Sequence, residues 1–384
     1  MALSKIDVAN MLTGLVPNDN TIRRPNAKPL IINGDMAVAQ RATSVTGVGD
    51  GDTGHNSLDR WRFSEGGDNS TVFTMSQDTD VPTGQGFANS LKMDVTTADA
   101  SPGSSDAMFL QQRFEGQDLQ LLKKGTSSAE KITVSFWVKS SKTGTHILEV
   151  QDSDNTRNCS QSYTVSSADT WEKKVVVFPA DTTGALDDDN ANSFEINWWL
   201  LAGTDFTSGT LATSFASRTN ANRAVGQVNI GDNTSNNFYM TGCQMEIGEF
   251  SSTTLPPFQF ESFGDNLKRC QRYYYKLKND SGSATGAYWG NSIVDSSTTL
   301  KGTIRFPKMR TVPSAFETTG TASDYRVWTS GNTSTVCSSV PTLDQITSFS
   351  GRLLFTVSSG LTAGQVGGYR SSTTDAYLAW SAEL

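Results

Sequence analysis

Only two histidines, His55 and His146, are available for acid–base or nucleophilic chemistry in this 384-residue chain. A Ser–His–Asp arrangement would have to use one of them, since histidine is the usual base of such triads. Neither lies near a nucleophile motif such as Gly-x-Ser-x-Gly. His55 falls in a loop rich in glycine and aspartate, and His146 falls in a predicted strand. We therefore expect surface or strand-edge histidines, and we predict no catalytic residue.

Two acidic clusters, residues 152–155 (Asp-Ser-Asp-Asn) and 187–190 (Asp-Asp-Asp-Asn), carry groups suited to glycoside cleavage or calcium binding. Carboxylate pairs meet only in space, so the sequence leaves cleavage open. The first cluster begins like an EF-hand loop, but the sixth position is not glycine and no glutamate closes the loop. Both clusters are typical of solvated turns, and we predict no metal or cofactor.

The four cysteines are far apart and show no Cys-x-x-Cys pairing. Metal-site spacing is therefore absent, and a disulfide framework is not expected in so long a chain. Cys243 and Cys270 lie on predicted apolar faces, where cysteine behaves as a small core residue.

Aromatic side chains are the remaining chemical signal, because sugars stack on aromatic rings beside hydrogen-bonding amides. Between residues 194 and 200, alternation places Trp199 and Asn197 on the face opposite the apolar one. Trp137 likewise lies opposite the apolar face of its own predicted strand. We predict Trp199, Trp137 and Asn197 as ligand-binding residues, with Trp199 the most exposed of the tryptophans. The alternative is burial of these rings against a neighbouring domain or subunit.

Composition describes the scaffold that would position these groups. Hydrophobic residues make up 36% and charged residues 18% of the chain, and 33 glycines occur among many Ser, Thr, Asn and Asp residues. This profile is typical of many short strands joined by polar turns. A net charge of −8 argues against non-specific binding to nucleic acid. The sequence shows neither a membrane-spanning apolar run nor a secretory signal, so we expect synthesis in a cytoplasm without membrane insertion.

Alternating apolar and polar residues predict an all-β fold. Strand patterns repeat at residues 132–139, 146–150, 171–178, 194–200 and 238–247, and indicate a large jelly-roll β-sandwich over residues 30–259. An earlier strand is expected at residues 30–41, with a turn at Asn33-Gly34. Further patterns after residue 287 predict a second, smaller β-sandwich over residues 280–384.

One helix is expected between the two sandwiches, in a hinge spanning residues 260–279. Asp265 could cap its first turn, and Leu267, Cys270 and Tyr274 would share one face. We predict inter-subunit or inter-domain contacts for Arg272, Tyr274 and Lys268. A helix packed on the edge of a single β domain is the alternative.

Residues 1–29 form a predicted arm, in which Ser4 could cap a short helix closed by Gly14. Three prolines then punctuate polar sequence. An arm without a core of its own suits docking to a partner, and a frayed terminus is the alternative.

Several segments together resemble a group of bacteriophage tail-fibre and tail-tip proteins. The matching segments are residues 30–41, 58–61 (Leu-Asp-Arg-Trp), 132–139, 242–248 (Gly-Cys-Gln-Met-Glu-Ile-Gly), 260–274 with its Cys-Gln-Arg-Tyr-Tyr, and the terminal Ser-Ala-Glu-Leu of residues 381–384. The resemblance implies a jelly-roll domain like a carbohydrate-binding module, trimeric assembly and a place on the virion. It identifies no ligand.

The leading hypothesis is a non-enzymatic virion protein, a homotrimeric tail-fibre or tail-tip subunit that binds a bacterial surface glycan or protein receptor. Its arm, residues 1–29, would attach it to other tail proteins. The alternatives are a capsid decoration, head-fibre or tail-adaptor protein with a structural role, and a surface-polysaccharide depolymerase, which would need a carboxylate pair in a groove.

Overall fold

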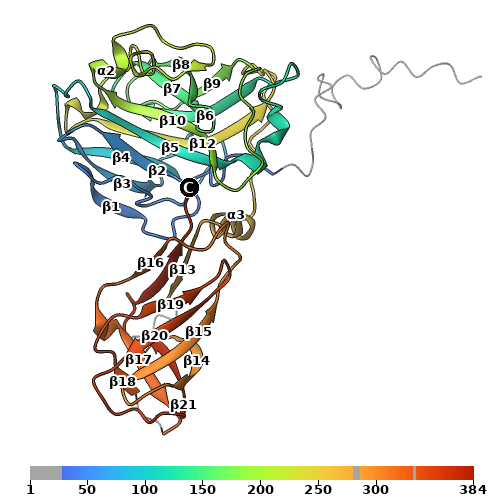
Figure 1. The fold of residues 1–384 in the computed structure, drawn as a ribbon. Coiled ribbons are helices and arrows are strands. Elements are labelled where there is room, and N and C mark those ends of the chain that lie inside the picture. The colour runs from blue at the N-terminus through green and yellow to red at the C-terminus, as the bar shows by residue number, and fades with distance from the viewer. Residues whose placement is uncertain (1–27, 280–285, 332–333) are drawn as a thin grey trace, which may run out of the picture.

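A computed structural model describes residues 28–279, 286–331 and 334–384, and within them the chain is almost entirely β. Figure 1 shows a large β-sandwich, a short helix below it and a smaller β domain that ends in the C-terminus beside the large one. The predicted all-β class is confirmed, with a jelly-roll sandwich followed by a helical joint and a second sandwich.

The large sandwich consists of two six-stranded antiparallel sheets. The first sheet has the order β1 (Ser44–Gly49), β3 (Val72–Asp78), β4 (Ser90–Thr97), β12 (Asn237–Ile247), β6 (Ile132–Ser140) and β9 (Glu172–Phe178). The second has the order β11 (Ala216–Ser217), β8 (Arg157–Val165), β7 (Gly144–Asp152), β10 (Asn192–Ala202), β5 (Ala107–Glu115) and β2 (Arg62–Gly66).

Short helical turns lie in the connections. They are η1 (Gly116–Asp118), η2 (Gln120–Leu122), α2 (Thr204–Thr207), η3 (Asn220–Asn222), η4 (Ile230–Asp232) and, in the small domain, η5 (Ala322–Asp324).

Large aromatic side chains fill the space between the two sheets. The Trp198 ring meets Trp61 edge-on at 5.3 Å and Phe136 at 5.7 Å between ring centroids, and all three side chains are fully buried. Alternation in β6 and β10 therefore predicted the inward face correctly. Burial of such rings supplies the largest apolar contribution to the core.

The small domain packs a three-stranded sheet on a seven-stranded one. The first has the order β13 (Tyr274–Lys278), β22 (Tyr377–Ser381) and β16 (Ala315–Thr318). The second has the order β18 (Ser334–Val336), β17 (Tyr325–Thr329), β21 (Val366–Ser371), β14 (Tyr288–Val294), β15 (Thr299–Arg305), β20 (Ser350–Thr356) and β19 (Thr342–Ile346). Trp380 stacks on Phe306 at 4.9 Å in the shared core.

The helix of the joint, α3 (Phe263–Cys270), is shorter than predicted and is capped differently. Ser262 is the capping residue, and its hydroxyl accepts a hydrogen bond from the Asp265 amide at 3.2 Å. The Ser262 hydroxyl also donates to the Asp265 carboxylate, so Asp265 orients the capping side chain rather than capping the helix itself. Tyr274 lies beyond the helix, at the start of β13, so it does not share a helical face with Cys270.

The strand predicted at residues 30–41 is absent. The Ile32 amide donates to Gln112 Oε1 at 2.8 Å, and Gln112 Nε2 donates back to the Ile32 carbonyl. The Gly34 carbonyl accepts a hydrogen bond from the Cys243 amide of β12 at 2.9 Å, but no strand ladder forms. Asn33 has a φ of 59°, which no strand residue adopts. Gly34 lies so close to the Cys243 carbonyl that a Cβ atom there would be only 2.1 Å away. The apolar run is therefore a buried, irregular segment.

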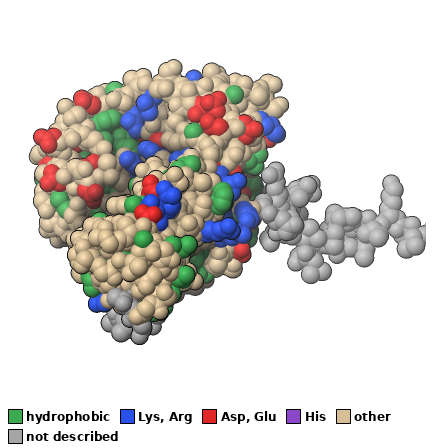
Figure 2. Space-filling view, turned by 60° about the horizontal axis from the view of Figure 1, so that its bottom comes forward, with side chains coloured by type: hydrophobic (Ala, Val, Ile, Leu, Met, Phe, Trp, Pro, Cys, Tyr) green, Lys and Arg blue, Asp and Glu red, His purple; other side chains and the backbone are tan. Residues whose placement is uncertain are grey.

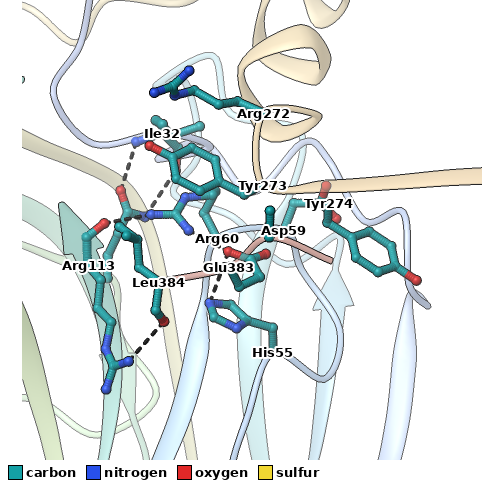
Figure 3. Close-up of polar contacts among 12 residues, drawn as sticks. Ile32, His55, Asp59, Arg60, Arg113, Arg272, Tyr273, Tyr274, Glu383 and Leu384 are labelled. Atoms are coloured by element: carbon teal, nitrogen blue, oxygen red, sulfur yellow. Dashed lines mark hydrogen bonds and ion pairs between the residues drawn. The ribbon is translucent and has the colours of Figure 1, made fainter. Parts of the chain in front are cut away.

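The C-terminal tail joins the small domain to the large one. Glu383 forms ion pairs with Arg60 and, at 3.3 Å, with Arg41. His55 Nε2 lies 3.4 Å from the same carboxylate, and Figure 3 shows Arg60 and His55 beside Glu383. Arg60 is itself 1% exposed. The expectation of a surface histidine at position 55 is wrong, because the tail covers it.

Arg310 of the small domain holds this tail in place. Its guanidinium donates to the carbonyls of Ala382 and, at 2.8 Å, Glu383, and it also reaches Asn190 of the large sandwich at 2.7 Å. The tail is therefore fixed from both domains.

We predict that acid weakens this junction. Burial lowers the pKa of His55 from 6.5 to about 3. As the pH falls, the unfolded chain therefore binds a proton at this residue before the folded chain does, and the free energy of unfolding decreases between pH 6.5 and 3. Burial alone would raise the pKa of Glu383, but His55, Arg60 and Arg41 lower it from 4.5 to about 2. The Glu383 carboxylate therefore contributes its full share to the free energy of unfolding above pH 4.5, and this contribution is lost as the pH falls toward 2.

Urea unfolding at pH 7, 5.5 and 4 measures this dependence. The variant His55→Gln should show a shallower loss of unfolding free energy than the wild type. Some loss should remain, since burial also lowers the pKa of His146 to about 4. Parallel pH profiles for the two proteins would contradict the assignment.

Candidate functional site

The outer face of the β2-β5-β10-β7-β8 sheet carries two rows of polar side chains that run across the strands. Backbone register sets neighbouring members of each row directly opposite one another. From strand to strand, the first row is Arg62, Gln111, Asn197 and Glu149, and the second row is Arg113, Glu195, Gln151 and Asn158. Directly opposed side chains on one face of antiparallel strands lie about 5 Å apart. The rows therefore form a continuous polar surface on the side opposite the aromatic core.

Hydrogen bonds between neighbours fix the orientation of these side chains. Gln111 Nε2 donates to Glu195 Oε2 and to Asn197 Oδ1, each at 2.8 Å. Gln151 Nε2 donates to Glu149 Oε2 at 3.1 Å. Side chains held in this way keep little rotamer freedom, so a ligand bound on them would not have to order them.

Arginines cover the carboxylates of the face. Arg113 Nε lies 3.2 Å from Glu195 Oε1, and Arg223 donates to both oxygens of Glu149 at 2.8 and 3.0 Å. Arg218 is exposed and donates to Gln151 Oε1 at 2.9 Å. The open part of the surface thus offers guanidinium donors, which suit hydroxyl and carboxylate acceptors.

Residues 203–224, including α2, cover one end of the face. The Ser160 hydroxyl on β8 donates to the Arg223 carbonyl at 2.7 Å, and the Ser160 amide donates to the Ala212 carbonyl at 2.7 Å. This segment buries Glu149 and Asn197 completely. Arg62 and Arg113 lie outside its cover and are half-buried, whereas Gln151 is buried and bonded to Arg218 of this segment.

The prediction that Trp199 is exposed is wrong: the residue is 0% exposed. Its ring packs against Phe109 at 5.0 Å and Phe206 at 5.5 Å, and the Arg223 guanidinium lies 5.0 Å from it. Trp199 Nε1 donates to Glu149 Oε2 at 3.1 Å. Alternation placed Trp199 on the correct face, but residues 203–224 then fold over it.

The other two predicted ligand-binding residues lie on different sheets. Asn197 belongs to the polar face and is buried within its hydrogen-bond network. Trp137 projects from β6, in the first sheet, and is half-buried. The structure therefore does not bring Trp137 and Trp199 together, and their role in binding a ligand stays a prediction.

The residues predicted for inter-subunit or inter-domain contact have different surroundings. Arg272 donates to both oxygens of the buried Glu115, at 2.7 and 2.6 Å, and so links the joint to β5 of the same chain. The Tyr274 hydroxyl donates to Glu317 at 3.0 Å, and the Arg41 guanidinium lies 3.6 Å from its ring. Lys268 is exposed.

The acidic clusters form structural turns. Asp152 is buried and pairs with Lys124, which also pairs with Asp181 at 2.9 Å. Asp154 accepts a hydrogen bond from the Asp187 amide at 2.9 Å, which joins the two predicted turns. Asp152 of the first turn is therefore part of a buried ion-pair cluster. Asp154, Asn155 and residues 187–190 are exposed, as expected of solvated turns.

No three His, Cys, Asp or Glu side chains converge on a metal-sized site among the described residues. His146 is fully buried and stacks on Tyr163 at 5.4 Å, so the strand-edge expectation for it is wrong. Cys243 and Cys270 are buried and free, as predicted, and burial raises the pKa of both thiols.

The sequence missed the contribution of β5. Gln111 and Arg113 alternate with the buried Leu110 and Phe114, a two-residue period that marks a strand with one polar face. Arg62, on β2, alternates in the same way with the buried Phe63. Arg218 and Arg223 could not be found, because they reach the sheet from an irregular segment.

In the described part of the chain, no helix has the length and apolarity that crossing a bilayer requires. No family model matches the chain, and no curated protein matches it in sequence.

Solved structures with a similar fold include both phage and carbohydrate-binding proteins. A bacteriophage CBA120 tailspike protein 4 domain matches 49% of this chain and 19% of its own, at 17% identity and a TM-score of 0.27. The family 11 carbohydrate-binding module of Lic26A-Cel5E from Clostridium thermocellum matches 50% of this chain and 90% of its own, at 12% identity and a TM-score of 0.26.

TmCBM61, solved in complex with β-1,4-galactotriose, matches 58% of this chain and 99% of its own, at 11% identity and a TM-score of 0.27. The tailspike match spans less than a fifth of that protein. Similarity this low gives no residue-by-residue correspondence, so the function of the polar face depends on this chain's own side chains.

We predict that Trp199→Ala destabilises the fold. Removing a fully buried tryptophan leaves a cavity and should lower the unfolding free energy by about 3–5 kcal/mol. The half-buried Trp137, changed to Ala, is the matched control and should have a smaller effect. Urea unfolding of the two variants measures the difference, and an unchanged stability of Trp199→Ala would contradict the packing described.

Proposed function

We propose that this chain is a phage virion protein, a tail-fibre or tail-tip subunit, that binds a glycan of the host surface during adsorption. The glycan would lie on the outer face of β5, β10 and β7. Binding without catalysis fits the carboxylates there, because Glu149 and Glu195 are both engaged by arginines.

The observation that carries the proposal is the double row of ordered amide and guanidinium groups. Sugars present many hydroxyl groups, and each needs a hydrogen-bond partner when it leaves water. Arg113 and Arg218 offer such partners on the open part of the face. The buried Gln111 and Gln151 accept hydrogen bonds from these arginines and fix their orientation. Few apolar side chains occur on the open part of this face, so hydrogen bonding rather than stacking would dominate recognition.

Virion location and trimeric assembly are parts of the same proposal and rest on the sequence resemblance. Residues 1–27 of the predicted arm, with the helix predicted after Ser4, lie outside the described residues. Three copies held together would raise the avidity of a weak single site through effective concentration.

Binding of the purified full chain to an array of bacterial surface polysaccharides tests the proposal. The variant Arg218→Ala should bind about 10- to 100-fold more weakly, since it removes an exposed charged hydrogen-bonding group. Arg305→Ala, the same change at an exposed position of the small domain, is the matched control and should bind like the wild type. Equal binding by the wild type and the face variant would refute the assigned surface.

A second candidate function is structural, as a capsid decoration, head-fibre or tail-adaptor protein. Two exposed phenylalanines favour it: Phe260 and Phe263 are 51% and 61% exposed at the start of α3. Exposed apolar rings of this kind often form protein contacts. Lysine and arginine side chains gather where the small domain meets the large one (Figure 2).

Sedimentation separates the two candidates. If the role is structural, Phe260→Ser/Phe263→Ser should dissociate the assembled chain, and no polysaccharide on the array should bind. Retained assembly in this variant, together with glycan binding by the wild type, would exclude the purely structural role.

A further inference from the structure

Two arginines converge on one oxygen atom at the β2 edge of the polar face. Arg113 Nε, from β5, donates to Gln111 Oε1 at 2.8 Å, and Arg62, from β2, donates to the same atom at 3.4 Å. Both side chains are half-buried. Two positive groups are thus held side by side on the open part of the surface.

Their positive charges are only partly balanced by the protein. Arg113 has Glu195 at 3.2 Å and also donates to the backbone oxygen of Leu384 at 2.8 Å. Among the described residues, Arg62 forms no ion pair, and Gln111 is its only hydrogen-bond acceptor. Burial and the neighbouring Arg113 both lower the pKa of Arg62, as expected for a cation held beside another cation.

Arg62 therefore has donors available for a ligand. A guanidinium carries five N–H groups in a planar fork, and the bond to Gln111 uses one of them. This fork matches the two oxygens of a carboxylate, and a bound anion would also relieve the repulsion between Arg62 and Arg113.

We propose that Arg62 and Arg113 bind the anionic substituent of an acidic sugar, a carboxylate, within the glycan bound on this face. This inference rests on the proposed function and specifies its ligand class. Arg218, held over β7 by its hydrogen bond to the buried Gln151, would bind hydroxyl groups of the same glycan. At a strand spacing of about 4.8 Å, the three steps from β2 to β7 span about 14 Å, more than one sugar ring, so the ligand is an oligosaccharide.

Titration calorimetry of the full chain tests this inference with three probes: oligogalacturonate, its fully methyl-esterified form and a dextran sulfate fragment. The first two share a backbone and differ only in charge. The wild type should bind oligogalacturonate about 10- to 100-fold more tightly than the ester, the ratio expected for charged hydrogen bonds. Added salt should reduce this preference.

Two variants test whether the preference for the acid over the ester depends on Arg62. Arg62→Gln should bind the acid and the ester equally, whereas Arg305→Gln, the same change at an exposed site of the small domain, should keep the wild-type ratio. Arg62→Lys preserves the charge without the fork and should keep part of the preference. If circular dichroism shows that Arg62→Gln does not fold, Arg62→Lys replaces it as the test of the arginine fork.

Different failures have different meanings. Equal affinity of the wild type for acid and ester overturns the acidic-sugar inference, while glycan binding itself stands. Tighter binding of dextran sulfate than of oligogalacturonate overturns the carboxylate assignment. If neither these probes nor any polysaccharide on the array binds, the inference and the proposed function both fail.

Discussion

The buried ion pair between Arg60 and Glu383 is the interaction on which the two-domain arrangement depends. Arg60 is enclosed by the large sandwich and lies against the Tyr273 ring, with the guanidinium carbon 3.5 Å from the ring centroid. A buried cation needs a counter-charge, and the last but one residue of the chain supplies it. The C-terminal tail must therefore enter the large domain, and the small domain follows it. Figure 3 shows this convergence.

The same tail reaches the polar face through Arg113. This side chain contacts the Leu384 backbone oxygen on one side and Glu195 and Gln111 on the other. The junction and the candidate glycan surface are therefore adjacent parts of one hydrogen-bonded network. Rigidity at the junction would hold the binding groups in place, which is the property that a surface for weak, repeated contacts with a glycan requires.

Local alternation was enough to predict the strands and their inward faces. In β10 it separated Trp198, in the core, from Asn197 and Trp199, on the outer face. It could not predict that residues 203–224 fold over Trp199, because that segment has no period and its placement depends on distant partners. Residues 30–41 look like a strand by composition, yet their amides bond to Gln112, 80 residues away from Ile32. Long-range polar contacts of this kind leave no local pattern.

The central claim is that a glycan binds on the outer face of β5, β10 and β7. A crystal structure of the full chain with an acidic oligosaccharide that binds in solution tests it most directly. The account predicts sugar density between Arg218 and Arg113, with a carboxylate against Arg62. Density on the small domain, or on the β6 sheet near Trp137, with the polar face empty, would contradict it.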